Sequence, residues 1–90
     1  MQNKRKHSSL NKLFGLNVKL ERTRLGLTQE ELALRIPTEQ PYLSKVERGT
    51  VSTSLDFVER IAAALNAKPA DLFDENLGRG SVAGASQGRR

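Results

Sequence analysis

The sequence predicts a compact all-α domain of five helices, with a flexible basic arm before it and a disordered tail after it. Apolar residues recur every three or four positions rather than in alternation, which is the spacing of helices with one buried face. Glycine, asparagine and proline stand where these periodic runs end. Ninety residues without cysteine allow one small core that forms without disulfides. We therefore expect an arm at residues 1–9, a helical domain at 10–76 and a Gly/Ser/Arg tail at 77–90.

The first helix is expected to start after a cap at Ser8 or Ser9 and to end at Gly26. Gly15 inside this helix costs roughly 1 kcal/mol relative to alanine. The apolar residues near one stripe are Leu10, Phe14, Val18 and Leu25. The residues that we assign to the core of the whole domain are Leu10, Phe14, Leu32, Leu43, Ile61 and Phe73.

The second helix is expected to span Thr28–Ile36, and both of its ends carry a signal. Thr28 and Glu31 match a capping box, in which the hydroxyl and the carboxylate each accept a backbone N–H of the other residue. Pro37 ends the helix and biases Ile36 away from the right-handed helical region.

The third helix is expected at about Gln40–Arg48, followed by Gly49 as a left-handed stop. Pro41 restricts Gln40 to extended geometry, which leaves open whether Gln40 is helical or caps a helix that starts one residue later. Two short helices joined by a tight turn suit the major groove of DNA.

A fourth helix is expected after a cap at Thr53 or Ser54, and Asn66 is a suitable left-handed stop. Its expected buried face consists of Leu55, Val58, Ile61, Ala62 and Leu65. Pro69 is placed to open a short fifth helix at the first helical position. From residue 78 the chain offers little to bury and is predicted to be disordered.

The net charge of +5 is unevenly distributed along the chain. Residues 11–75 hold 9 basic and 10 acidic residues, so the excess of positive charge lies at the two ends. The basic residues at the ends are Lys4, Arg5, Lys6, Arg79, Arg89 and Arg90. These ends either add contacts to phosphates or only aid solubility, and both interpretations are open.

Several functional classes are excluded by the sequence. The single histidine, His7, lies in the predicted arm, and no nucleophile or acid–base pair stands in a recognisable frame, so we expect no enzyme. Without cysteine or a second histidine we expect no metal site, and we expect no cofactor. We expect neither a signal peptide, because residues 1–10 are polar and basic, nor a membrane-spanning segment, because no long apolar run occurs. A cytoplasmic protein is expected, associated with the nucleoid of a bacterium or of a phage or plasmid host.

The motifs together, from about Phe14 to Phe73, resemble the helix-turn-helix domain of the lambda-repressor/Cro-like (XRE) family. The matching segments are Arg22, Gly26–Ala33, Tyr42–Gly49, Ser54–Asp56, Arg60–Leu65 and Pro69–Phe73. Pro37 stands where the family usually has a turn glycine, so this turn cannot use a positive φ there. The resemblance implies a regulator that binds double-stranded DNA, by default a repressor on an inverted-repeat operator as a homodimer. The alternative is an antitoxin or a restriction-modification controller that acts partly through a protein partner, a toxin or RNA polymerase.

The resemblance also implies which residues face DNA. Base contacts are expected from Glu39, Gln40, Pro41, Tyr42, Ser44 and Lys45. A glutamine amide can pair with adenine and a lysine with guanine, so Gln40 and Lys45 are the strongest of these. Phosphate contacts are expected from Thr28, Gln29, Arg48, Thr50, Ser52 and Ser54.

Two further sets have structural roles. An ion pair between Arg22 and Glu47 is implied by the resemblance and would orient the third helix. Leu72, Phe73 and Leu77 are the candidates for a two-fold contact, unless Leu72 and Phe73 only close the core.

Overall fold

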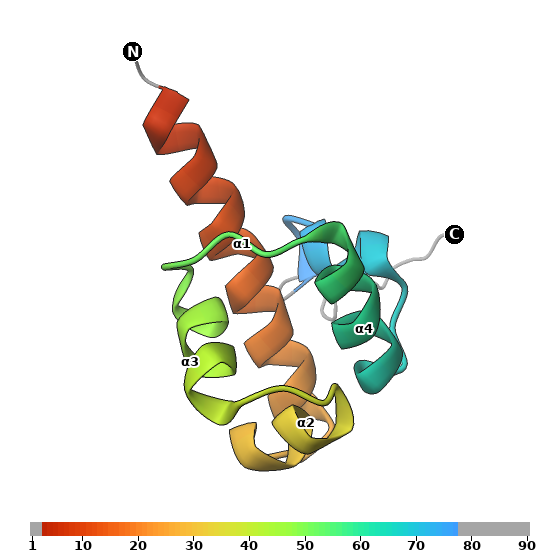
Figure 1. Ribbon diagram of the computed structural model, residues 1–90. Coiled ribbons are helices and arrows are strands. Elements are labelled where there is room, and N and C mark those ends of the chain that lie inside the picture. The colour runs from red at the N-terminus through yellow and green to blue at the C-terminus, as the bar shows by residue number, and fades with distance from the viewer. Residues whose placement is uncertain (1–2, 78–90) are drawn as a thin grey trace, which may run out of the picture.

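The computed structural model describes residues 3–77, which form four α-helices and one 3₁₀ helix and contain no strand (Figure 1). The helices are α1 (Asn3–Arg24), α2 (Gln29–Arg35), α3 (Gln40–Arg48), α4 (Leu55–Leu65) and the 3₁₀ helix η1 (Pro69–Phe73). The all-α class is therefore confirmed, although the fifth helix is a single 3₁₀ segment rather than an α-helix. The predicted tail lies outside the described residues from residue 78 onward, and the division into arm, domain and tail stays a prediction.

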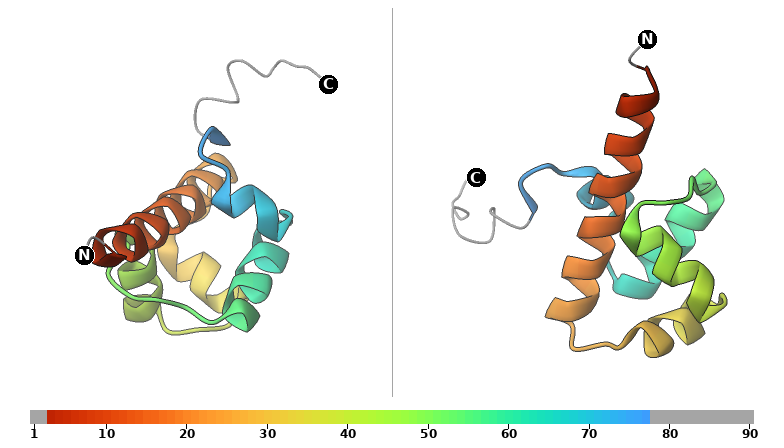
Figure 2. Two further views of the ribbon diagram at one scale, coloured as in Figure 1. Left: turned by 90° about the horizontal axis from the view of Figure 1, so that it is seen from above. Right: turned by 90° about the vertical axis from the view of Figure 1, so that its left-hand side faces the viewer.

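The start of α1 differs from the expectation. The helix begins at Asn3, so the predicted cap at Ser8 or Ser9 is wrong. No glycine or proline precedes Gly15, and a serine inside a helix costs only about half a kcal/mol, which is too little to end it. Figures 1 and 2 show the N-terminal part of α1 projecting beyond the other helices.

The core lies between α1, which forms one side of the molecule, and the other four helices. Buried apolar residues come from every element: Phe14, Val18, Leu32, Ala33, Ile36, Leu43, Val46, Phe57, Val58, Ile61, Ala62, Leu65 and Leu72. Phe14 stacks on Phe73 of η1 with ring centroids 5.1 Å apart. The buried amide of Asn17 donates to the carbonyl oxygens of Leu72 and Asp74, at 3.1 and 2.9 Å. These contacts fix η1 against α1.

Three leucines do not take their expected places in the core. Leu10 is 53% exposed and Leu55 is 80% exposed, and Leu25 also lies at the surface. The position next to the α4 stripe is filled instead by Phe57, whose ring meets Tyr42 of α3 edge-on at 5.2 Å. Leu55 and Phe57 flank that stripe at about equal angles on a helical wheel, so the position of α3 decides which of them is buried.

Two glycines let the C-terminal end of α3 approach α1 closely. A β-carbon at Gly15 would overlap the backbone carbonyl oxygens of Val46 and Glu47. A β-carbon at Gly49, where φ is 75°, would lie 2.7 Å from Cα of Lys12. Gly15 therefore does more than weaken α1, because only glycine permits the two helices to touch at this point.

The predicted helix ends are mostly confirmed. Thr28 and Glu31 form the capping box at α2, with bonds of 3.0 and 2.8 Å, and Ser54 rather than Thr53 caps α4. Gly49 and Asn66 adopt the left-handed conformation that ends α3 and α4. Each of these ends is determined by residues within four positions of it.

The turn between α2 and α3 corrects two expectations. Ile36 remains in the right-handed helical region, with φ −64° and ψ −43°, despite the following proline. Its N–H donates to the Leu32 carbonyl and its side chain is buried, and these contacts hold it there. Helix α3 starts at Gln40 with Glu39 as its N-cap and Pro41 as its second residue, so the alternative with Gln40 as cap is wrong.

Candidate DNA-binding surface

A buried carboxylate joins α3 to both preceding helices. Glu47 accepts bonds from Nε and Nη2 of Arg22 on α1, at 2.7 and 3.0 Å. The side chains of Arg22 and Glu47 are only 13% and 3% exposed, and the Arg22 guanidinium also donates to the Leu27 carbonyl at 2.8 Å. Glu47 accepts a further bond of 2.9 Å from the Gln29 amide on α2. Three hydrogen bonds to one buried anion therefore fix how α3 lies on α1 and α2.

Gln29 connects the buried Glu47 carboxylate to Gln40 at the exposed start of α3. A carboxylate only accepts hydrogen bonds, so the Gln29 amide nitrogen must face Glu47 and its oxygen must face outward. That oxygen accepts a 2.7 Å bond from Nε2 of Gln40. Gln40 keeps one N–H and its own carbonyl oxygen for other partners. One donor and one acceptor are what the major-groove edge of adenine requires.

The other expected base-contacting residues occupy different environments. Glu39, Pro41 and Lys45 are exposed, as Gln40 is. Ser44 is half-buried and accepts a 2.6 Å bond from Arg48 one turn later. Tyr42 is half-buried, and one part of its ring packs edge-on against Phe57 at 5.2 Å.

Several expected phosphate contacts already have hydrogen-bond partners within the chain. The hydroxyls of Thr28 and Ser54 accept backbone N–H groups as caps, which leaves each O–H free to donate. The Thr50 hydroxyl donates to the Lys45 carbonyl at 3.2 Å, and Ser52 accepts from Asn11 of α1 at 3.3 Å. Side-chain hydrogen bonds therefore connect the loop after α3 to α3 itself and to α1.

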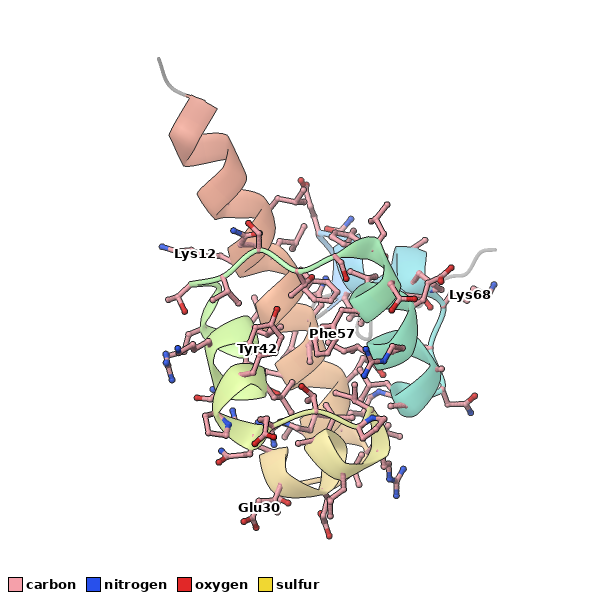
Figure 3. The ribbon with its side chains drawn as sticks, viewed as in Figure 1. Lys12, Glu30, Tyr42, Phe57 and Lys68 are labelled. Atoms are coloured by element: carbon pink, nitrogen blue, oxygen red, sulfur yellow. The ribbon has the colours of Figure 1, made fainter. Side chains whose placement is uncertain are left out.

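One candidate residue was missed by the sequence analysis. Lys12 of α1 is exposed and stands beside the loop after α3, because its backbone packs against Gly49 (Figure 3). Within residues 3–77 no carboxylate forms an ion pair with Lys12. Residues 12 and 49 are far apart in the chain, so only the crossing of α1 and α3 could reveal this placement.

The candidates for a two-fold contact separate into two kinds. Leu72 is fully buried within the single chain and closes the core, which leaves it no surface for a partner. Phe73 and Leu77 are half-buried, and Phe73 has one face on Phe14.

Two features are absent from the described part of the chain, a cluster of metal ligands and a membrane-spanning helix. Among residues 9–77, whose side chains the structure describes, no group of three or more Asp or Glu side chains could hold a metal ion. No helix among those described is long and apolar enough to cross a membrane.

A short helix with an exposed polar face, held across a second helix by a tight turn, defines a helix-turn-helix DNA-binding fold. A family model described as helix-turn-helix matches residues 18–73. The chain belongs to this XRE-type helix-turn-helix family of DNA-binding transcription regulators.

Relatives of known name or structure agree with this assignment. Control protein C.BamHI of Bacillus amyloliquefaciens is 41% identical over 63 residues, which span 69% of this chain and 78% of that protein. The restriction-modification controller C.AhdI from Aeromonas hydrophila has a TM-score of 0.71 at 36% identity, over 74% of this chain and 97% of that chain. The clp gene regulator ClgR from C. glutamicum has a TM-score of 0.72 at 32% identity, over 77% and 88% of the two chains.

Proposed function

We propose that this protein binds a specific DNA sequence with α3 in the major groove. The observation that carries the proposal is the continuous set of hydrogen bonds from Arg22 through Glu47 and Gln29 to Gln40. Each bond fixes the next side chain, so the Gln40 amide is oriented before DNA arrives. An oriented group loses less conformational freedom on binding, which favours affinity for the matching base.

The contacts with DNA divide into those that read sequence and those that position the domain. We assign base contacts to residues of α3 and of the turn before it that are exposed or half-buried: Glu39, Gln40, Pro41, Tyr42, Ser44 and Lys45. We assign phosphate contacts to the residues around that surface: Lys12, Thr28, Gln29, Arg48, Thr50, Ser52 and Ser54. Arg48 would release Ser44 when it turns to a phosphate, which makes the Ser44 hydroxyl available to a base.

Dimeric binding follows from the size of this surface. One short recognition helix contacts too few base pairs for high specificity, so domains of this kind bind two half-sites about one helical turn apart. Phe73 and Leu77 remain the candidates for the contact between two copies, since neither is fully buried. Repression by occlusion of a promoter is the output we propose, because it requires no surface beyond the DNA-binding one. A cytoplasmic location follows from this function and stays a prediction.

A restriction-modification controller is the second candidate function. Two of the relatives, C.BamHI and C.AhdI, are a control protein and a restriction-modification controller by name. We therefore favour a controller over an antitoxin among the alternatives that involve a protein partner. RNA polymerase is the partner that a controller acting on transcription would meet.

Selection of bound duplexes from a random pool, near 150 mM salt, tests the proposal. We expect an inverted repeat with half-sites about 10 base pairs apart. Failure to enrich any sequence over non-specific binding would contradict it.

Variants then test how α3 is placed in the groove. Gln40→Ala and Lys45→Ala should each weaken binding to the selected site by about 1–3 kcal/mol and relax its preference at one position. Lys68→Ala is the matched control for Lys45→Ala, because Lys68 is exposed and lies on the opposite side of the molecule from α3 (Figure 3). An unchanged specificity ratio in either α3 variant would show that the assigned placement is wrong.

A further inference from the structure

Helix α4 reaches the turn between α2 and α3 through one side chain. Arg60 donates from Nη2 to the carbonyl oxygen of Pro37, at 2.8 Å. Its guanidinium carbon lies 5.4 Å from the centroid of the Phe57 ring, within the range of a cation–π contact. Asp56, four residues earlier on α4, lies 3.9 Å from Nη1 of Arg60. The side chain is thus held at three points although it is 44% exposed.

The geometry of this turn determines where α3 begins. Pro37 has no N–H, so the turn has one backbone donor fewer than the glycine-containing turn of the family. Thr38 donates to the Ala33 carbonyl at 2.7 Å and holds the turn on the side of α2. Arg60 holds the opposite side through the Pro37 carbonyl. Gln40 follows only three residues later, so any change in the turn moves its amide directly.

The same region of α4 also contacts the recognition helix itself. Phe57, beneath the Arg60 guanidinium, meets the Tyr42 ring edge-on at 5.2 Å. Arg60 and Phe57 together therefore contact the turn at Pro37 and α3 at Tyr42. Figure 3 shows Phe57 between α3 and α4, facing Tyr42.

We propose that Arg60 is a positioning residue for sequence recognition, which fixes the turn and the start of α3 from α4 without contacting DNA. The proposal rests on the proposed function of α3. This role also explains why an arginine, rather than a lysine, suits position 60. A planar guanidinium can stack on Phe57 and donate to Pro37 at the same time, whereas a lysine ammonium has no flat face to stack.

The first test needs no DNA. Amide hydrogen exchange of the full chain is measured for the wild type and for Arg60→Gln, with Lys68→Gln as the control that removes the same charge. Arg60→Gln should speed exchange of the Thr38 N–H, while Lys68→Gln should leave it unchanged. Equal exchange at Thr38 in all three proteins would overturn the proposal, whatever the protein binds.

The second test measures binding to the selected duplex and to an unrelated duplex at several salt concentrations, at a temperature where every variant is folded. Arg60→Gln should weaken binding to the selected duplex about three- to tenfold, the effect of one lost hydrogen bond. Binding to the unrelated duplex should match that of Lys68→Gln. Arg60→Lys keeps the charge, so it should bind the unrelated duplex as the wild type does and still lose affinity for the selected one.

The outcomes separate the alternatives. A salt slope that falls by about one in Arg60→Gln and not in Lys68→Gln, with equal loss on both duplexes, would show a direct phosphate contact and overturn the proposal. An unchanged specificity ratio in a folded Arg60→Gln protein would overturn it as well. If the wild type selects no sequence, the proposed function fails, and the exchange experiment still decides whether Arg60 fixes the turn.

Discussion

Replacing Arg22 by methionine isolates the energetic role of the buried ion pair. Methionine keeps the apolar stem of the side chain and removes the guanidinium, so Glu47 retains only the bond from Gln29. The Glu47 side chain is only 3% exposed in the wild type, and a buried anion that has lost its cation is strongly unfavourable. We expect Arg22→Met to lower the free energy of unfolding by about 3–5 kcal/mol. A chain of this length has a total free energy of unfolding of roughly 5–13 kcal/mol. The variant should therefore be only marginally stable.

The double variant Arg22→Met/Glu47→Met removes both charges. Replacing a buried ion pair by apolar groups of similar volume is often neutral, so most of the lost stability should return, to within about 1–2 kcal/mol of the wild type. DNA binding should not return with it, because Gln29 loses the acceptor that orients it towards Gln40. Arg22→Lys keeps the charge without the fork of two donors and should fall between the wild type and Arg22→Met in stability.

Urea unfolding followed by circular dichroism at low temperature measures these differences, with affinity for the selected duplex measured in parallel. A loss of less than about 1 kcal/mol in Arg22→Met would refute this role of the ion pair, because Glu47 would then be solvated. A double variant that lost the sum of the two single losses, or that regained both stability and binding, would refute it as well.

Two further predictions follow from the crossing of α1 and α3. Gly15→Ala should destabilise the protein by about 1–3 kcal/mol in thermal or urea unfolding, although alanine favours helices, because its β-carbon meets the carbonyl oxygens of Val46 and Glu47. An unchanged or raised midpoint would contradict that close contact. Lys12→Gln should lower the salt slope of DNA binding by about one and weaken all duplexes alike, whereas Lys68→Gln should not. Equal slopes for the two variants would remove Lys12 from the phosphate contacts.

The sequence predicted the helix ends well wherever the decision is local. Each capping residue acts on backbone groups within a few residues, so its effect does not depend on the rest of the fold. This holds for the capping box of Thr28 and Glu31, the cap at Ser54 and the left-handed stops at Gly49 and Asn66. The predicted start of α1 is wrong because Ser8 and Ser9 cap a helix only if it begins there. Serine is also tolerated inside a helix, and α1 begins at Asn3.

Helical periodicity, by contrast, gives the direction of a buried face without identifying what packs on it. Leu55 and Phe57 flank the α4 stripe equally, and the position of Tyr42 decides that Phe57 is the buried one. Leu10 was assigned to the core from the same periodicity and is exposed. The apolar periodicity of one helix does not show how far the neighbouring helices extend along it, and so which of its apolar residues they cover.

The candidate site shows the same division. The residue types at Gln29, Gln40 and Glu47 could be read from the sequence, and the resemblance paired Glu47 with Arg22. The bonds from Gln29 to both Glu47 and Gln40, and from Arg60 to Pro37, depend on the angles at which α2, α3 and α4 meet. The sequence by itself therefore determined the all-α class and most of the helix ends, because these depend on neighbours along the chain, and it predicted the face that we propose to meet DNA. Only the tertiary structure decided which side chains hold that face in place, because those contacts join residues that are distant in sequence and adjacent only after folding.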